Sequence, residues 1–321
     1  MHRREFCKTA TAAAAALGLA APAAAKLTRA NVCFLTDEVS RDLTVALEFA
    51  AEFGVRLVEL RNVDGLYCFR HQPARLKQIA ALLKQNGIRV AALSTPLLKC
   101  VLPDSRLTEQ SKREIQLSLK DFPVPVEEQF PRQMEFLHQA IEAARILGTD
   151  QLRIFSYWRV EDRQKERARI VEGLSRVTEV AEKQKIRLAI ENEGACNLAD
   201  CEETASVLNQ LKSPWLGMVW DVVNGTSTGE IPWPDGFSKL DAKRIWHLHI
   251  KDSRRDPQTG RRQTCAVGDG ETPYLEIFTA LGRAGYTGAL SMETHFTIDG
   301  KREPASRRSM QGLLRVIENL A

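Results

Sequence analysis

The 321-residue chain lacks several patterns that would assign it to a class at once. It contains no two cysteines in the spacing C-x-x-C, which argues against zinc ribbons and thioredoxin-type redox chemistry. It has little charge bias, because 45 Lys and Arg face 41 Asp and Glu, and its arginine pairs are scattered. A nucleic-acid partner is therefore not expected. No apolar run approaches the ~20 residues that span a bilayer, so stable membrane insertion is not expected either.

The first 25 residues have the composition of an export signal. Arg3 and Arg4 precede Phe6 and a run rich in alanine and leucine, and the small residues 23–25 offer a cleavage site. Paired arginines before a short apolar run are typical of twin-arginine signal peptides. We expect residues 1–25 to be cleaved and residues 26–321 to form an exported, periplasmic domain. The alternative is an alanine-rich helix.

Seven cysteines are present, and six of them follow the predicted signal. An even number in an exported protein permits disulfides. However, the twin-arginine route carries folded proteins, so folding would occur in a reducing compartment. Cys33 and Cys100 also lie in or beside apolar runs. Buried free thiols are therefore the favoured interpretation.

The remaining sequence alternates between apolar runs and amphipathic stretches. Continuous apolar runs predict buried parallel strands, near 31–35, 55–60, 88–93, 151–155, 186–190, 216–220, 245–250 and 288–292. Helical periodicity occurs between them, over 41–53, 73–86, 132–147, 162–184, 200–211, 272–284 and 304–320. Gly54, Gly87, Gly148 and Gly285 stand where helices should end. Eight such units predict an α/β fold of the (β/α)8 TIM-barrel type, and a doubly wound open sheet is the alternative.

Two segments depart from this alternation. Residues 94–131 contain five prolines, and residues 252–270 are rich in Arg, Asp and Gly. Long loops inside a compact domain are usually functional or disordered. We expect the first to be a wall or lid over the active-site face of the barrel, and the second to lie on the same face.

Four consecutive apolar runs in the second half of the chain end in a side chain that can bind a metal ion. The runs are IRLAIE, LGMVWD, RIWHLH and GALSME, and they end at Glu191, Asp221, His249 and Glu293. Parallel strands of a barrel bring their carboxyl ends to one face, so these side chains should converge there. Three carboxylates and one imidazole suit a divalent ion such as Mn, Mg, Co or Zn, and the oxygen-rich set favours Mn or Mg.

Other residues near these strand ends are candidates for contacts with a substrate. His247 and Lys251 share a strand face with His249, because side chains alternate along a strand. We expect His247 one layer deeper and Lys251 at the rim. Glu59 closes the run VRLVEL and is interpreted as a substrate-side or a structural polar residue. Trp158 follows a strand end and is the preferred aromatic wall, although a tryptophan near a strand is more often part of the core.

The chain resembles the xylose isomerase-like TIM-barrel family of sugar isomerases and epimerases. The resemblance lies in AIENEG (189–194), GMVWDVVNG (217–225), IWHLHIKD (245–252), VGDGE (267–271) and YTGALSMETH (286–295). It implies that one divalent metal ion is held by Glu191, Asp221, His249 and Glu293. It further implies that Arg255, six residues after the metal histidine, contacts the sugar; a solvated loop charge is the alternative.

The chain departs from the family pattern at two positions. Many members have histidines where this chain has Glu193 and Asn224, and those histidines often contact substrate. The resemblance therefore does not identify the substrate. Asn224 remains a candidate for substrate binding because of its position.

The resemblance implies a metal-dependent sugar isomerase or epimerase. Glu191 and Glu293 would remove a proton next to a carbonyl and return it through a metal-stabilised enediolate. The alternative is an exported lyase or hydratase acting on 3-keto-glycosides with the same metal and glutamate base. A sugar or glycoside is the expected partner, and a homo-oligomer is compatible with the sequence.

Two other functions fit the sequence less well. An apurinic endonuclease shares the barrel but needs three metal ions and more histidines than the six present here. His71, His138 and His295 in particular lack the expected strand-end partners, so this activity is not expected. A sugar-binding protein without turnover is a weaker alternative, because both predicted catalytic glutamates are intact.

Overall fold

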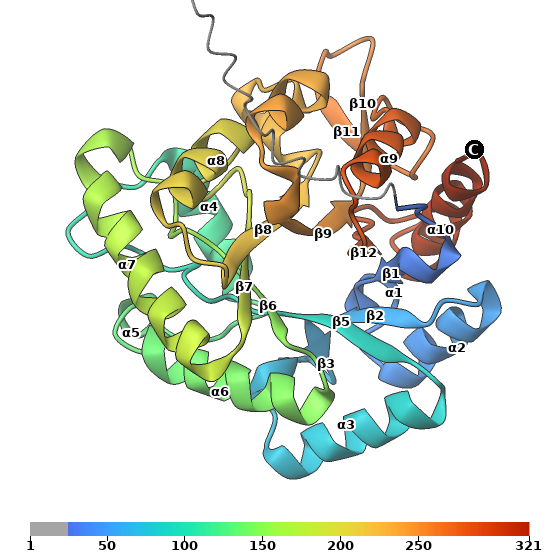
Figure 1. The fold of residues 1–321 in the computed structure, drawn as a ribbon, viewed down its shortest axis with the longest axis horizontal. Coiled ribbons are helices and arrows are strands. Elements are labelled where there is room, and N and C mark those ends of the chain that lie inside the picture. The colour runs from blue at the N-terminus through green and yellow to red at the C-terminus, as the bar shows by residue number, and fades with distance from the viewer. Residues whose placement is uncertain (1–24, 321) are drawn as a thin grey trace, which may run out of the picture.

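The computed structural model describes residues 25–320, so nearly all of the predicted signal peptide lies outside the described residues. Eight parallel strands form a nearly closed barrel (Figure 1). They are β1 (Val32–Phe34), β2 (Leu57–Leu60), β5 (Arg89–Ser94), β6 (Gln151–Ile154), β7 (Arg187–Glu191), β8 (Leu216–Asp221), β9 (Ile245–Ile250) and β12 (Ala289–Met292). The bounds of each strand differ by at most two residues from those of a predicted apolar run. The predicted TIM-barrel architecture therefore agrees with the structure.

The strand order follows the sequence around the barrel. Neighbouring strands are hydrogen-bonded in the order β1-β12-β9-β8-β7-β6-β5-β2. Leu35, just after β1, forms a parallel bridge with Glu59 of β2 and brings the two ends of the sheet together. Asp221 pairs in register with His249 across β8 and β9. The carboxyl ends of these neighbouring strands therefore lie beside one another.

Most of the helices cover the outside of the barrel (Figure 1), whereas the helix Glu109–Ser118 lies beside the carboxyl ends of the strands. The helices are α1 (Thr36–Val39), α2 (Leu43–Phe53), α3 (Pro73–Gln85), α4 (Glu109–Ser118), α5 (Val126–Gln129), α6 (Gln133–Leu147), α7 (Arg163–Gln184), α8 (Cys201–Gln210), α9 (Tyr274–Arg283) and α10 (Arg302–Glu318). Gly54 and Gly148 end α2 and α6 in the left-handed conformation, with φ of 67° and 77°. Both positions agree with the predicted helix ends. None of the helices among residues 25–320 has the length and apolar character needed to cross a membrane.

One of the eight units has no α-helix. Only short helical turns join β8 to β9, over 224–228, 232–236, 237–239 and 242–244. Three glycines and two prolines lie between residues 225 and 236. Glycine weakens a helix through backbone entropy, and proline removes a hydrogen-bond donor, so a continuous helix is disfavoured here.

The two irregular segments contain regular elements that the sequence did not predict. Residues 94–131 include α4 and α5 rather than forming a bare loop. Residues 252–270 include an antiparallel hairpin of β10 (Asp252–Arg255) and β11 (Arg262–Cys265). A second hairpin, of β3 (Asn62–Val63) and β4 (Leu66–Tyr67), follows β2.

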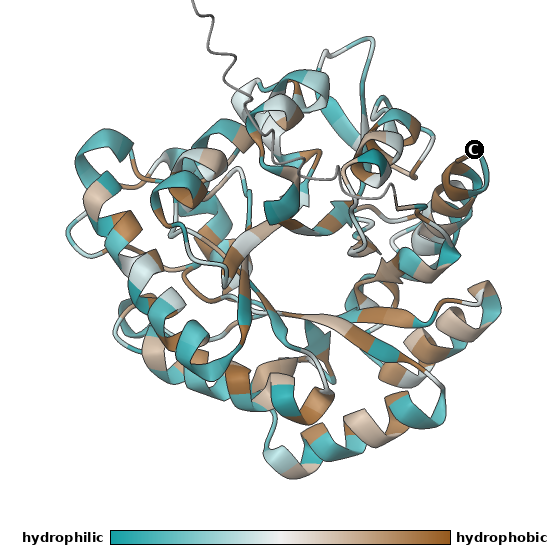
Figure 2. Cartoon of the chain, in the orientation of Figure 1, coloured by the Kyte–Doolittle hydropathy of each residue, from teal (hydrophilic) through white to brown (hydrophobic). Residues whose placement is uncertain are grey.

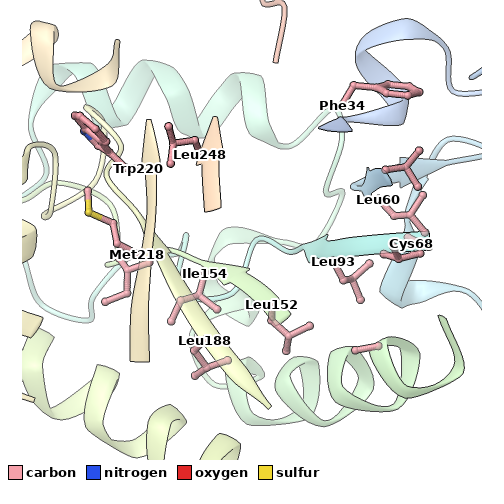
Figure 3. Packing of buried hydrophobic residues seen from close by; sticks show 14 of the residues in the cluster. Phe34, Leu60, Cys68, Leu93, Leu152, Ile154, Leu188, Met218, Trp220 and Leu248 are labelled. Carbon is pink, nitrogen blue, oxygen red and sulfur yellow. The ribbon is translucent and has the colours of Figure 1, made fainter. Parts of the chain in front are cut away.

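The main hydrophobic core lies between the strands and the surrounding helices. Apolar residues follow the strands and the inner faces of the helices (Figure 2). Leu152, Leu188 and Leu248, from three different strands, have no exposed surface and belong to one cluster (Figure 3). Burial of such aliphatic side chains stabilises a fold by about 1.5–3 kcal/mol each. This core fixes the strands, and therefore the side chains at their ends.

The cysteines are consistent with the interpretation as free thiols. All six cysteines among residues 25–320 are free, and five of them are buried. The fold is therefore held by packing and hydrogen bonding in the described part of the chain.

Candidate metal centre and active site

The four predicted metal ligands converge at the carboxyl ends of β7, β8, β9 and β12. One donor atom from each residue can be chosen so that all four lie within 4.8 Å of one another. His249 Nδ1 lies 3.0 Å from Glu191 Oε1 and 3.4 Å from Glu293 Oε2. All four side chains are buried. The strand-end residues that the sequence singled out thus form one compact cluster.

The donor set fits a divalent cation. Three carboxylates and an imidazole are ordinary ligands of such ions, and buried carboxylates need a positive partner. Asp221 Oδ2 is buried and accepts no hydrogen bond from the described residues. Lys251 Nζ does lie 2.8 Å from this oxygen, but not in hydrogen-bonding geometry. This contact compensates charge. Asp221 Oδ2 accepts no hydrogen bond in the described residues that a bound cation would have to displace.

Glu59 holds His249 from the side opposite the carboxylate ligands. Glu59 Oε2 lies 3.1 Å from His249 Nε2, while Nδ1 faces Glu191 and Glu293. Ser291 donates to the same Glu59 oxygen at 2.6 Å, and Ser94 donates to the other. A carboxylate that accepts from one ring nitrogen fixes the tautomer and leaves the other nitrogen for a metal ion. Glu59 is thus placed to orient the imidazole.

The charges of the cluster shift the pKa values of its members. Burial by itself would raise the pKa of Glu191, but His249 and Arg153 outweigh it and lower this pKa to about 2. For Asp221, burial dominates and raises the pKa, although Lys251 opposes it. Burial would lower the pKa of His249, but Glu59, Glu191 and Glu293 raise it well above its usual value. Attraction between the carboxylates and their cationic neighbours thus opposes the effect of burial in all three cases.

A cavity of about 570 Å³ opens above this cluster at the mouth of the barrel. Glu191 and Glu293 line its floor, and Trp158 lines its wall. The segment 94–131 contributes further wall residues, which are Pro96, Lys99, Glu114, Leu117, Ser118, Asp121, Phe122 and Gln129. The prediction that this segment forms a wall of the site agrees with the structure.

A larger cavity, of about 1150 Å³, lies at the opposite end of the barrel. It is lined by residues near the amino ends of the strands, such as Leu57, Arg89 and Gln151, and by none of the four clustered residues. Active sites of TIM barrels lie at the carboxyl ends of the strands. We therefore assign the active site to the smaller cavity.

The six candidate substrate residues fall into two groups. Trp158 lines the mouth cavity, and Lys251 lies 3.3 Å from Glu293 Oε2 beside the clustered carboxylates. Lys251 is buried, however, whereas the sequence placed it at the rim. Like Lys251, the other four, His247, Glu59, Asn224 and Arg255, are not among the residues that line the mouth cavity.

These four residues have partners elsewhere in the structure, and their contact with a substrate stays a prediction. His247 and Glu59 are fully buried and pair with each other at 2.9 Å, below the mouth. Asn224 donates to the Asn192 carbonyl and links the ends of β7 and β8. Arg255 is an exposed residue of the β10–β11 hairpin and donates to the Gly260 carbonyl. The sequence predicted the deeper position of His247 and offered a structural role for Glu59, whereas the surroundings of Asn224 and Arg255 depend on loops that strand parity does not describe.

Two arginines in the site were missed by sequence reasoning. Arg153 Nη1 donates to Glu191 Oε2 at 2.6 Å, and Arg61 Nη1 donates to Glu293 Oε1 at 3.0 Å. Each predicted catalytic glutamate thus has a guanidinium partner. Arg153 stands inside the apolar run QLRIF, and a lone charge in such a run is the signal that would have found it.

Three other residues line the mouth cavity although the sequence did not predict them as site residues. His295 was expected to lack a strand-end partner, but its Nε2 lies 3.1 Å from Glu293 Oε1, and it lines the cavity. Lys99 and Glu193 form an ion pair of 3.1 Å in the cavity wall. Glu193 was noted only as a departure from a family pattern, and Lys99 has no strand-end signal.

Comparison with known proteins assigns the fold and the family. The family model of the xylose isomerase-like TIM barrel matches residues 47–316, which is most of the chain. The chain belongs to this family. The resemblance seen in the sequence is therefore confirmed.

A curated relative and solved structures agree with this assignment. D-psicose 3-epimerase of Enterocloster bolteae is 29% identical over 149 residues, which cover 44% of this chain and 46% of that enzyme. The match thus spans less than half the length of the relative. A crystal structure of the IolI protein with a zinc atom has a TM-score of 0.68 at 18% identity, covering 91% of this chain and 99% of the other. The probable 3-DHS dehydratase AsbF of Bacillus anthracis has a TM-score of 0.65 at 18% identity, covering 88% and 98%.

Proposed function

We propose that the protein is a divalent-metal-dependent sugar isomerase or epimerase that works by proton transfer next to a carbonyl. The observation that carries the proposal is the convergence of Glu191, Asp221, His249 and Glu293 beneath the mouth cavity. The likeness to D-psicose 3-epimerase supports an epimerase or isomerase. A sugar is the substrate class that this enzyme family and the polar cavity favour.

In this proposal the two glutamates exchange protons with the substrate. Glu191 lies on β7 and Glu293 directly follows β12, so their carboxylates approach the cavity from different sides of its floor. One removes a proton from the carbon beside the carbonyl, and the other delivers a proton. Proton transfer of this kind contributes roughly 10²–10⁴ in rate. Arg153 and Arg61 hold the two carboxylates in position through one hydrogen bond each.

The four clustered residues would hold the metal ion. Bound there, a divalent ion supplies Lewis-acid stabilisation of negative charge on substrate oxygens. The three carboxylates favour the harder ions Mn and Mg over Co and Zn. His249 would offer Nδ1, because Nε2 faces Glu59.

Solvent exchange of the substrate proton tests the proposal. Mn-loaded protein incubated with ketohexoses in deuterium oxide should introduce deuterium beside the carbonyl, measured by proton NMR. Glu191→Gln and Glu293→Gln should each abolish the exchange, while circular dichroism shows a folded barrel. Asp256→Asn, an exposed acid of the hairpin loop, is the matched control. Unchanged exchange in both glutamine variants would exclude the mechanism.

A lyase or hydratase is the second candidate, because the probable dehydratase AsbF has the same fold. Elimination also begins with proton removal beside a carbonyl, so the same glutamates would serve. Incubation with 3-keto-glycosides distinguishes the two reactions. Release of the aglycone supports the lyase, and exchange on free ketoses without such release supports the isomerase.

A further inference from the structure

Two cations of the mouth cavity pack against one aromatic ring. Arg153 Cζ and Lys99 Nζ each lie 4.3 Å from the centroid of the Phe155 ring. Lys99 Nζ also lies 5.2 Å from the Trp158 ring. All four residues line the mouth cavity. The ring contacts hold both cations in fixed positions, which is typical of cation–π packing.

Both cations keep hydrogen-bond donors without an acceptor. Arg153 is 3% exposed, and among residues 25–320 its guanidinium donates a single hydrogen bond, to Glu191. A guanidinium has five N–H donors, so most of its donors are unused. Its Nε is buried and has no partner in the described part of the chain. Lys99 likewise makes one hydrogen bond, to Glu193, from an ammonium with three donors.

A buried cationic donor without an acceptor, such as Arg153 Nε, is costly, and the Lys99 side chain, which is 20% exposed, has donors left over. A ligand with anionic oxygens would therefore fit this pair. In the structure, the negative charge of Glu191 neutralises the positive charge of Arg153. If Glu191 also binds a divalent ion, its negative charge is shared, and Arg153 can accept a second anion. This step rests on the proposed function, because it needs the metal ion beside Glu191.

We propose that the substrate is a sugar acid whose carboxylate lies against Arg153 and Lys99. A planar carboxylate matches the geometry of a guanidinium and carries one negative charge. A phosphate dianion fits less well, because Glu191 and Glu193 lie directly beside the two cations and repel additional negative charge. The cavity of about 570 Å³ accommodates a hexose-sized acid above the clustered carboxylates.

Three ketoses that differ only at carbon 6 test this assignment. D-fructose is neutral there, D-fructuronate carries a carboxylate, and D-fructose 6-phosphate carries a phosphate. Binding to Mn-loaded protein is measured by calorimetry, and deuterium exchange beside the carbonyl by NMR. We expect D-fructuronate to bind about tenfold more tightly than D-fructose, as a charge-assisted contact predicts.

Substitution of Lys99 tests whether this side chain contributes to binding of the carboxylate. Lys99→Met should reduce the preference for D-fructuronate over D-fructose to less than about threefold, and Lys99→Arg, which retains a positive charge, should reduce it less. Lys112→Met removes an exposed lysine from α4 in the same wall and should retain the wild-type preference. Circular dichroism verifies that each variant is folded.

The outcomes separate this proposal from the proposed function. Equal binding of D-fructose and D-fructuronate to the wild-type protein overturns the sugar-acid assignment, even if both ketoses exchange deuterium. Tighter binding of D-fructose 6-phosphate replaces the carboxylate by a phosphate and also overturns it. If no ketose exchanges deuterium but D-fructuronate binds preferentially, the isomerase proposal fails, while the carboxylate site at Arg153 and Lys99 is supported.

Discussion

At the scale of single residues, function depends on which atom each side chain presents. His249 illustrates this, because both of its ring nitrogens face carboxylates, Nε2 toward Glu59 and Nδ1 toward Glu191. The sequence identified His249 and noted Glu59, but not that one orients the other. Spacing along a chain gives the strand and its face, whereas the choice between two nitrogens depends on packing across the barrel.

Glu59→Gln should weaken metal binding without unfolding the protein. The amide keeps the shape of the side chain but removes the charge that orients His249. Loss of such a partner typically lowers metal affinity about 10–100-fold. Calorimetric titration of the metal-free protein with Mn measures the effect. Ser94→Ala, which removes one donor to Glu59 and leaves its charge, serves as control, and equal Mn affinity of wild type and Glu59→Gln would contradict the orienting role.

Thiol labelling should be slow and selective. Burial, followed by the charge of Asp252, raises the pKa of Cys265 to about 11, and burial raises that of Cys68 to about 12. A thiol reacts as the thiolate, so at pH 8 only about one Cys265 in a thousand is reactive, and labelling should accelerate about tenfold per pH unit. Among the six cysteines of residues 25–320, mass spectrometry should find Cys265 labelled first, because it is the one that is partly exposed. Cys265→Ser should remove this labelling, and rapid labelling of a buried cysteine in the native protein would contradict the burial.

At the scale of elements, the loops after the strands are held by buried polar anchors. Asp252, the last residue of HLHIKD, accepts from the backbone N–H groups of Ser253, Gly268, Gly270 and Thr272, at 2.9–3.2 Å. It thus ties the start of the β10–β11 hairpin to the segment VGDGE. Two of the motifs that carried the family resemblance meet here, and this meeting is structural rather than catalytic.

Gly270→Ala should disturb this anchor. The added Cβ would overlap Asp252 Oδ1 and lie 2.8 Å from the Ser253 carbonyl oxygen. We expect a loss of about 3 kcal/mol in the free energy of unfolding, as for other overpacked sites. Gly229→Ala is the control, because no atom lies within 4 Å and only its φ of 89° is strained, which costs about 1–2 kcal/mol. Urea denaturation measures both, and equal losses would argue against the proposed close packing.

At the scale of the whole molecule, the barrel gathers negative charge at one point. Four strands that are neighbours in the sheet each deliver a ligand residue to the mouth. Packing of the apolar core stabilises this arrangement, although the buried carboxylates repel one another. Lys251, Arg61 and Arg153 offset part of the repulsion. A divalent cation in the cluster should offset the rest.

Metal addition should therefore raise the melting temperature. At a free metal concentration 100 times the dissociation constant, binding stabilises the native state by about 2.7 kcal/mol. For a domain of this size we expect an increase of roughly 4 °C over the chelated protein. Differential scanning calorimetry with Mn and with a chelator measures it. Asp221→Asn should show a much smaller shift and Asp256→Asn the full one; a full shift in Asp221→Asn would place the metal elsewhere.

The sequence by itself determined the strands, most of the helices and the four residues that gather at the strand ends. It could do so because the alternation of apolar runs and the position of a residue at the end of a run are local properties. The folded structure alone places Glu59 against His249, Arg61 and Arg153 against the two glutamates, and Arg255 on an exposed hairpin. These relations join residues as far apart as 61 and 293, and no spacing along the chain encodes a distance across a barrel.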